Sequence, residues 1–181
     1  MLDFSKIEKG VKDYSFREIR FNKVVKDVID LMRYTLKMKG FNLETKLNNF
    51  NDLICGDADA ITEAIENIIS NAIRFSINNK EIIISSYSKD NFVCVSVKDN
   101  GIGINQFDKE KIFDPFFRSE DARAKKIEGT GLGLPIVKNI VEEHKGKILI
   151  ESTPGFGSIF TLCFPVLSNS KGADDEEYFN H

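Results

Sequence analysis

The sequence predicts an α/β fold: a two-layer sandwich in which one mixed sheet is covered on one face by three helices. Three stretches carry apolar residues at helical spacing, and six short stretches are rich in the β-branched and aromatic residues typical of strands. Strands and helices alternate in the first half of the chain, whereas the last four strands come as two adjacent pairs. Because alternation favours parallel strands and adjacent pairs favour antiparallel ones, the sheet has to contain both.

Two strands and two helices are expected in the first half of the chain. FREIRF at 16–21 is expected as an edge strand, and the following helix begins after Asn22, a good N-cap residue, and ends at Gly40. FNLETKL at 41–47 alternates as a strand. The second helix begins near 57–59 and carries a row of apolar residues, which are Ile61, Ile65, Ile68, Ile69 and Ala72.

Four strands and one helix are expected in the second half. The strands are EIIISS at 81–86, NFVCVSV at 91–97, KILIES at 147–152 and SIFTLCF at 158–164, and turns join the first two and the last two. A short aromatic helix is expected around KIFDPFF at 111–117. The charged stretch 118–128 has no periodicity and is expected to be mobile. The third helix follows a glycine run that begins at Gly129.

Composition and charge exclude several classes of protein. With 181 residues, of which 41% are hydrophobic, the chain can form one domain with an ordinary core. No apolar run approaches the roughly 20 residues that span a bilayer, and no signal segment opens the chain. We therefore expect a cytoplasmic domain without direct membrane contact, whether or not the parent protein is anchored to a membrane. A net charge of -3 argues against nucleic acid as a partner.

The three cysteines are expected to be reduced. Cys55, Cys94 and Cys163 are odd in number and widely spaced, which fits neither a disulfide framework nor a zinc site. Each is therefore expected to be a small buried apolar residue in a reducing compartment.

Three glycines at alternate positions come directly before the third helix. Gly129, Gly131 and Gly133 lie in GTGLGL, interleaved with Thr130 and Leu132. Glycine costs roughly 0.5–1 kcal/mol against alanine in regular structure, so its repetition indicates that bare main chain is needed. Because a helix N-terminus presents unpaired N–H groups and a partial positive charge, phosphate is the leading candidate ligand. A dinucleotide-binding G-x-G-x-x-G does not fit this spacing, and no Gly-Lys-Ser/Thr of a P-loop follows.

A polar stripe runs along the second helix beside its apolar side. Asn67, Asn71, Arg74 and Phe75 lie at i, i+4, i+7 and i+8 and therefore share one face. One such asparagine is ordinarily a solvated surface residue, but two at one-turn spacing with a cation and an aromatic indicate the wall of a site. An amide oxygen suits Mg²⁺, Arg74 could neutralise phosphate, and Phe75 could offer a face to a base.

A third candidate, Asp99 to Ile104 with the sequence DNGIGI, follows a strand expected to be central. Asp followed by glycines is often only a turn. The functional alternative is that the Asp99 carboxylate accepts a hydrogen bond from an exocyclic amine such as that of adenine, while Gly101 and Gly103 let the ring lie against the backbone. A hydrogen bond to a charged group contributes about 1.5–3 kcal/mol, which is enough to select adenine over guanine.

Taken in order, the Asn stripe, DNGIG, FDPFFR, GTGLGL and the GFGS turn resemble the N, G1, F, G2 and G3 boxes of the catalytic ATP-binding domain of sensor histidine kinases. The resemblance runs from about Phe16 to Pro165 and implies the same Bergerat-type fold, with ATP between the Asn-bearing helix and a flap. It also implies that 13–166 is the catalytic domain and that 1–12 ends a helix of a dimerisation and phosphoacceptor domain. The polar, acidic composition of 167–181 predicts a disordered tail.

The resemblance implies a role for each matching residue. Asn71 would bind Mg²⁺, Asn67 would help to position phosphates and water, and Asp99 would bind the adenine amine. Arg118 closes the F box and would reach the terminal phosphate, so it and Asn67 are the implied catalytic residues. The residues implied in nucleotide binding are Asn67, Asn71, Arg74, Phe75, Asp99, Gly101, Gly103, Ile104, Gly129, Thr130, Gly131, Leu132 and Gly133.

One departure from the family's pattern bears on the reaction. The family's phosphoacceptor is a His followed by an acidic residue on an upstream helix, and neither His144 nor His181 matches it. His144 is expected to complement the dipole of the third helix. The resemblance therefore implies a kinase part that phosphorylates a His of the dimerisation domain, with a response regulator receiver domain as a further partner. Two alternatives stay open: an ATPase of the gyrase, mismatch-repair or chaperone kind, which has a Glu where Asn67 stands, and a degenerate module that only binds nucleotide.

Overall fold

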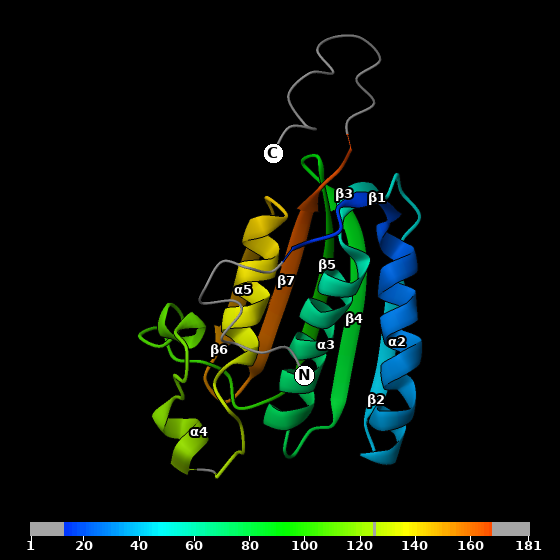
Figure 1. The fold of residues 1–181 in the computed structure, drawn as a ribbon. Coiled ribbons are helices and arrows are strands. Elements are labelled where there is room, and N and C mark those ends of the chain that lie inside the picture. The colour runs from blue at the N-terminus through cyan, green and yellow to red at the C-terminus, as the bar shows by residue number, and fades with distance from the viewer. Residues whose placement is uncertain (1–12, 125, 168–181) are drawn as a thin grey trace, which may run out of the picture.

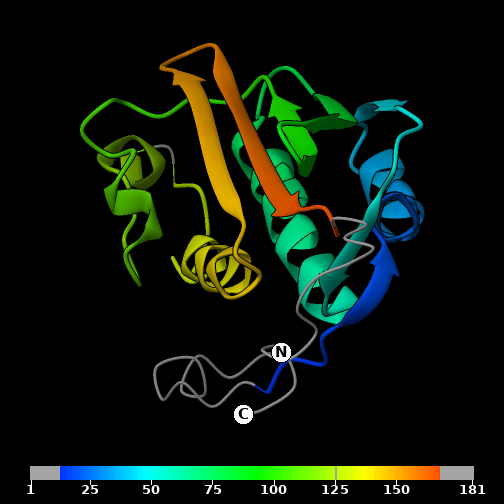
Figure 2. The same ribbon diagram turned by 90° about the horizontal axis from the view of Figure 1, so that it is seen from above.

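In the computed structural model, which describes residues 13–124 and 126–167, a five-stranded sheet is covered on one face by three helices (Figure 1). The helices are α2 (Phe21–Met38), α3 (Ala58–Phe75) and α5 (Gly133–Glu143). Figure 2 shows that all three lie on the same side of the sheet. The two-layer α/β sandwich predicted from the sequence is confirmed.

Two of the predicted segments fall largely outside the described ranges. These are the dimerisation-domain helix expected at 1–12 and the tail expected at 167–181, of which only the first residue is described. Among the residues that are described, no helix is both long enough and apolar enough to span a bilayer.

The main sheet has the strand order β2-β4-β5-β7-β6. Its members are β2 (Asn42–Leu47), β4 (Glu81–Lys89), β5 (Phe92–Asp99), β6 (Lys147–Thr153) and β7 (Gly157–Pro165). β2 is parallel to β4, and every other neighbouring pair is antiparallel, so the sheet is mixed. The parallel pair is the one separated in the chain by α3, and the hairpins form the other side of the sheet.

Alternation along β5 positions the candidate acid. Val93, Val95 and Val97 are buried in the core under the helices, and Asp99 is the next residue of the same orientation. The predicted apolar row of α3 is fully buried against this face of the sheet. Asp99 therefore ends its strand on the helix side, where α3 also ends.

The N-terminus of α2 is capped by a residue remote in sequence, contrary to the predicted N-cap at Asn22. The Asn22 side chain accepts a hydrogen bond from Ser86 Oγ and donates one to the Asn48 carbonyl. Asp52 caps the helix instead, because its carboxylate accepts from the Asn22 N–H and its carbonyl accepts from the Phe21 N–H. A remote residue thus satisfies N–H groups that a local cap usually satisfies.

A second sheet and two short helices differ from the prediction. The predicted edge strand appears as β1 (Arg17–Arg20), which pairs antiparallel with β3 (Leu53–Gly56) in a separate two-stranded sheet. The stretch predicted without periodicity contains α4 (Glu120–Ala124). Of the predicted aromatic helix, only the 3₁₀ turn η1 (Lys111–Phe113) forms. These elements have only three to five residues, too few to show a period in the sequence.

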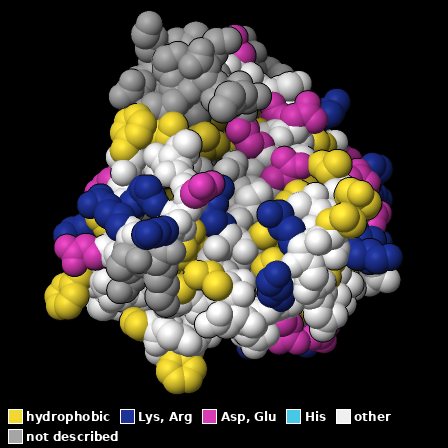
Figure 3. Space-filling view, turned by 90° about the horizontal axis from the view of Figure 1, so that it is seen from below, with side chains coloured by type: hydrophobic (Ala, Val, Ile, Leu, Met, Phe, Trp, Pro, Cys, Tyr) yellow, Lys and Arg dark blue, Asp and Glu magenta, His cyan; other side chains and the backbone are white. Residues whose placement is uncertain are grey.

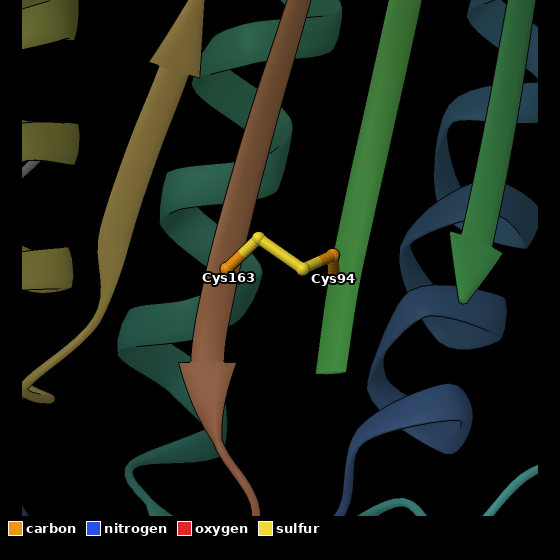
Figure 4. The surroundings of a disulfide bond; sticks show 2 residues. All are labelled: Cys94 and Cys163. Atoms are coloured by element: carbon orange, nitrogen blue, oxygen red, sulfur yellow. A yellow bond between two sulfur atoms is a disulfide. The ribbon is translucent and has the colours of Figure 1, made fainter. Parts of the chain in front are cut away.

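Two of the cysteines form a disulfide, so the prediction of three reduced cysteines is wrong. Cys94 on β5 and Cys163 on β7 are direct partners in the strand register, with 4.1 Å between their Cα atoms, and their sulfur atoms are bonded. Figure 4 shows the bond on the face of the sheet away from α3. Cys55 is free, but it is exposed, so the prediction that it is buried is wrong. The two bonded residues are 69 positions apart, and only the pairing of β5 with β7 brings them together.

Candidate functional site

One cleft brings the three candidate segments together. It lies where α3 and β5 end and α5 begins, at the end of the molecule seen in Figure 3, where Lys and Arg side chains gather on two sides of a largely uncharged surface. The predicted residues that line the cleft are Asn71, Arg74, Phe75, Asp99, Gly103, Ile104, Arg118, Gly129, Gly131 and Gly133. Four predicted residues do not line it, namely Asn67, Gly101, Thr130 and Leu132.

Asp99 is the buried acid of the cleft, with only 5% of its surface exposed. Its Oδ1 accepts a hydrogen bond from the Gly101 N–H, with 2.7 Å between the two atoms. Burial raises the pKa of the Asp99 carboxyl to about 6, although hydrogen bonds from the backbone of Gly101 and Ser158 act to lower it. The carboxyl is therefore ionised at neutral pH but poorly solvated, and it favours a hydrogen-bond donor on a ligand.

Gly103 and Gly101 allow backbone segments to approach closely. Gly103 has φ +68°, and a Cβ atom there would lie 2.1 Å from the Thr153 carbonyl oxygen. A Cβ atom on Gly101 would lie 2.7 Å from Asp99 Oδ1 and 2.8 Å from the Phe75 carbonyl oxygen. Gly101 therefore packs its loop against the end of α3, behind the cleft.

The polar stripe of α3 lies against the glycine run. A Cβ atom added to Gly133 would lie 2.9 Å from Asn67 Oδ1, and one added to Gly129 would lie 3.0 Å from Arg74 Nη1. The Asn67 amide nitrogen donates to the Glu63 carbonyl, which leaves its oxygen turned toward the start of α5. Asn67 is thus beside the N-terminus of α5 although it does not line the cleft.

Asn71 supplies an amide oxygen to the cleft. This oxygen accepts a long hydrogen bond of 3.5 Å from Arg74 Nη1, a contact weak enough to be exchanged for a cation. Among the described residues, no three His, Cys, Asp or Glu side chains are grouped so that they could hold a metal ion. A Mg²⁺ ion at this place would therefore depend on Asn71, on water and on oxygen atoms of a bound ligand, a donor set that suits Mg²⁺.

The start of α5 forms another part of the wall. Gly133 and Leu134 line the cleft, and no side chain caps the N-terminus of this helix. The Thr130 hydroxyl instead accepts a hydrogen bond from the Leu132 N–H, within the glycine run. The first turn of α5 is thereby left open to an anionic group of a ligand.

Residues 117–124 and 126–129, here called the covering segment, close one side of the cleft. Ala122 and Ile127 are buried and line it. The Arg118 guanidinium donates to the Ile127 carbonyl and so closes the segment on itself. The cleft has a volume of about 110 Å³, smaller than the roughly 300–1,000 Å³ of typical ligand sites.

A strained residue directly before the covering segment, Phe116, is hydrogen-bonded to the glycine run. Phe116 has φ +64°, a region that bulky residues rarely adopt, and its N–H donates to the Gly131 carbonyl. Gly131 itself has φ +73°, and a Cβ atom there would lie 2.7 Å from the Phe116 carbonyl carbon. A main-chain hydrogen bond thus joins the F box to the glycine run, and the Phe116 side chain is 63% exposed.

Much of the apolar lining of the cleft and three of its polar residues are absent from the predicted site. The apolar lining residues missing from it include Ile102, Ile112, Phe117, Ala122, Ile127, Leu134 and Phe160. The polar residues are Ser119, Glu128 and Ser158, and Ser158 shares the orientation of Phe160 on β7. Alternation along the predicted last strand could have indicated it, because residues two apart in a strand face the same side.

Comparison with known proteins identifies the family. The family described as histidine kinase-, DNA gyrase B- and HSP90-like ATPase matches residues 56–168. This range includes α3, the end of β5 and the glycine run, and it covers more than half of the chain. The chain belongs to this family of ATPase domains.

Individual relatives of the chain within this family are histidine kinases. The chain is 41% identical to the sensor-like histidine kinase SenX3 of Mycolicibacterium smegmatis, over 68% of this chain and 32% of that protein. It is 32% identical to the cell-division control histidine kinase PdhS of Brucella anthropi, over 91% of this chain and 16% of that protein. The solved catalytic domain of histidine kinase ThkA matches with a TM-score of 0.71 at 31% identity, over 83% of this chain and 95% of that domain.

These similarities confirm the predicted resemblance to the catalytic ATP-binding domain of sensor histidine kinases. The chain spans about a third of the length of SenX3 and a smaller share of PdhS.

Proposed function

We propose that this chain binds ATP with Mg²⁺ in the cleft and transfers the γ-phosphoryl group to a histidine of a dimerisation and phosphoacceptor domain. The observation that carries the proposal is the convergence of Asn71 from α3, Asp99 from β5 and the glycine run 129–133 on one cleft. Carboxamide, carboxylate and bare main chain complement the metal, the amine and the phosphates of the nucleotide. Membership of the ATPase family supports ATP as the substrate.

The polar and aromatic residues in and beside the cleft have separate proposed roles. Asp99 accepts a hydrogen bond from the adenine amine, and Phe75 offers its face to the base. Arg74 and the N-terminus of α5 neutralise phosphate charge. Asn71 holds the Mg²⁺ ion, which when bound supplies further positive charge to the phosphates. Asn67 positions phosphates and water from beside the start of α5.

Catalysis depends mainly on positioning and charge neutralisation. An imidazole nitrogen of the acceptor forms a bond to the γ-phosphorus while the bond to the bridging oxygen breaks, and ADP leaves with that electron pair. The imidazole proton passes to a base on the acceptor's own domain. Arg118 leaves the Ile127 carbonyl when the covering segment moves, and its guanidinium then reaches the terminal phosphate.

The proposal extends to the organisation and partners of the protein. Residues 13–166 form the catalytic domain, and the acceptor belongs to a dimerisation domain to which 1–12 contributes the end of a helix. A receiver domain of a response regulator takes the phosphoryl group next. We place this domain in the cytoplasm, without direct contact to membrane or nucleic acid.

Asn67 distinguishes this proposal from the first alternative. ATPases of the gyrase, mismatch-repair and chaperone kind place a Glu at this position to take a proton from water, and the Asn67 amide has no such basicity. Slow hydrolysis in the absence of an acceptor is therefore expected. The second alternative, a module that only binds nucleotide, predicts binding without any turnover.

Transfer to an added acceptor tests the proposal. The chain is incubated with γ-labelled ATP, Mg²⁺ and the dimerisation domain of the same kinase, and acid-labile phosphohistidine is measured. A dimerisation domain with its acceptor His replaced by Gln is the matched control. If label appears on the intact acceptor and not on the control, the kinase proposal is supported. Rapid release of phosphate without labelled acceptor indicates an ATPase. Nucleotide binding with neither labelled acceptor nor released phosphate indicates the degenerate module.

A further inference from the structure

Ser152 joins three parts of the structure at the Asp99 end of the cleft. Its Oγ lies 2.8 Å from the Ile104 nitrogen, 3.0 Å from the Gly157 carbonyl oxygen and 2.8 Å from Ser158 Oγ. Ser152 on β6 and Ser158 on β7 are direct partners in the strand register. Ser158 lines the cleft and is 6% exposed, whereas Ser152 does not line it. Ser152 can therefore act on a ligand only through its neighbours.

Only one assignment of donors and acceptors satisfies all three hydrogen bonds of Ser152. A serine hydroxyl has one proton to donate and two lone pairs. The Ile104 N–H occupies one lone pair of Ser152, and the proton of Ser152 goes to the Gly157 carbonyl, which has none of its own. The remaining contact is a hydrogen bond only if Ser158 donates its proton to Ser152. Ser152 is then saturated, and Ser158 has only lone pairs left to face the cleft.

The direction in which the Ser158 hydroxyl proton points determines which ligand groups can bind at this end of the cleft. Asp99 and Ser158 are direct partners on β5 and β7, so they stand side by side in the sheet. Asp99 is an acceptor when ionised, and this assignment of donors makes Ser158 an acceptor as well. Two adjacent acceptors favour a base edge that carries an amine, as adenine does, and repel a carbonyl oxygen at the same place, as guanine has.

We propose that Ser152 is a positioning residue for base selectivity, because it fixes the direction of the Ser158 proton. The inference rests on the proposed function and deepens it, since it assigns the preference for adenine over guanine to a residue outside the cleft. Without the Ser152 hydroxyl, the Ser158 hydroxyl can turn its proton into the cleft and donate it to the guanine carbonyl.

The affinities of Mg-ATP and Mg-GTP for the Ser152→Ala variant test the proposal, measured by titration calorimetry. The ratio of ATP to GTP affinity is expected to fall about 3- to 10-fold, the effect of one neutral hydrogen bond. Ser152→Thr restores the hydroxyl and is expected to keep the wild-type ratio. Thr153→Ala removes the neighbouring exposed hydroxyl on the opposite face of β6 and is the matched control, with no expected change.

A merely structural role gives a different result. Loss of ATP and GTP affinity by the same factor, with an unchanged ratio, overturns the proposal. In the Ser152→Ala/Ser158→Ala double variant the ratio is expected to equal that of Ser158→Ala alone, and a further fall contradicts action through Ser158. Should Ser152→Ala fail to fold, the ratio of ATP to GTP affinity is measured for Ser152→Cys, in which a thiol of similar size replaces the hydroxyl. Because a thiol is a weaker donor and acceptor, the ratio is again expected to fall, and an unchanged ratio contradicts the proposal.

Failure of this inference is distinguishable from failure of the proposed function. A wild-type chain that binds neither nucleotide overturns both. A wild-type chain that prefers ATP, together with a Ser152→Ala variant of unchanged preference, overturns only the role of Ser152.

Discussion

The backbone N–H of Asp57 donates a hydrogen bond to Nε2 of His144, with 2.9 Å between the two nitrogens. Because Nε2 is the acceptor, the ring proton is on Nδ1, which is 2.7 Å from the Ile140 carbonyl oxygen. The imidazole is thus neutral and buried between the start of α3 and the end of α5. The contact with the Ile140 carbonyl, in the last turn of α5, is the kind that a His makes with a helix C-terminus, and the bond from Asp57 adds a link to the start of α3.

Replacement of His144 is therefore expected to destabilise the domain. His144→Ala leaves the Asp57 N–H without its acceptor and removes a ring that packs against Phe16 and Phe164. The expected loss is about 2–4 kcal/mol of unfolding free energy, measured by urea denaturation. Glu142→Ala, an exposed change two residues away, is the control and is expected to cost less than about 0.5 kcal/mol. Equal stability of the two variants would contradict the structural role.

The raised pKa of Asp99 predicts a pH-dependent stability difference. Because the pKa is about 6 in the folded protein against an ordinary value of 3.8 for the unfolded chain, the folded chain binds more protons between these values, and stability falls as pH rises through this window. Asp99→Asn removes this cost, so its stability relative to wild type is expected to rise between pH 4 and pH 6 by at most about 3 kcal/mol. Urea unfolding of both proteins at each pH measures it, and a constant difference would contradict the buried, ionised carboxylate.

Asp99→Asn is also expected to change nucleotide selection. Its amide retains one acceptor but loses the charge, so ATP binds more weakly and the preference over GTP declines by roughly 10-fold, as expected for a charge-assisted hydrogen bond. Titration with both nucleotides at pH 7.5 and pH 5 tests this. Wild-type affinity for ATP is expected to fall toward that of the variant at the lower pH, where the carboxyl is protonated. An unaltered ATP preference in the variant would remove the proposed role.

Asn71→Ala is expected to abolish the Mg²⁺ dependence of ATP binding while the domain stays folded. The side chain is on the cleft wall, and its loss removes the amide oxygen proposed as a metal ligand. ATP affinity is measured with Mg²⁺ and with EDTA. Asn49→Ala, an exposed asparagine in the loop between β2 and β3, is the matched control. If Mg²⁺ still increases the ATP affinity of Asn71→Ala, the metal is bound by other residues.

Substitution of two glycines with similar backbone conformation distinguishes the cost of a steric clash from the cost of a positive φ angle. Gly103 and Gly40 have φ +68° and +74°, but only Gly103 has atoms within 4 Å of an added Cβ. Gly40→Ala is expected to cost about 1 kcal/mol, and Gly103→Ala about 1–3 kcal/mol more with loss of nucleotide binding. Urea unfolding and ATP titration of the two variants measure this. Similar costs would show that the approach of Gly103 to Thr153 is easily relieved.

The long periodic elements were predictable, because their burial follows from local patterns. The apolar row of α3 and the alternation of β5 each extend over enough residues to show their period, and Asp99 follows from the second of these. The glycine run was predictable as a site because glycine is costly without a reason. Its pairing with Phe116 was not, since a backbone conformation with positive φ at phenylalanine has no sequence signal.

What escaped prediction depends on contacts between distant residues. The cap that Asp52 gives to α2 and the bond between Cys94 and Cys163 exist only after the chain has folded. The same holds for Ser152, an ordinary strand residue in the sequence that gains its importance from three neighbours on two other segments. Short elements such as β3 gave no period to detect.

The covalent link between β5 and β7 also restricts how the molecule moves. The two strands adjoin in the middle of the sheet and carry Asp99 and Ser158 at one end, so they cannot slide past one another without breaking a bond. A change that widens the cleft is therefore expected in the covering segment and not between β5 and β7. Asp99 and Ser158 therefore keep a fixed position relative to each other, whatever change occurs in the covering segment.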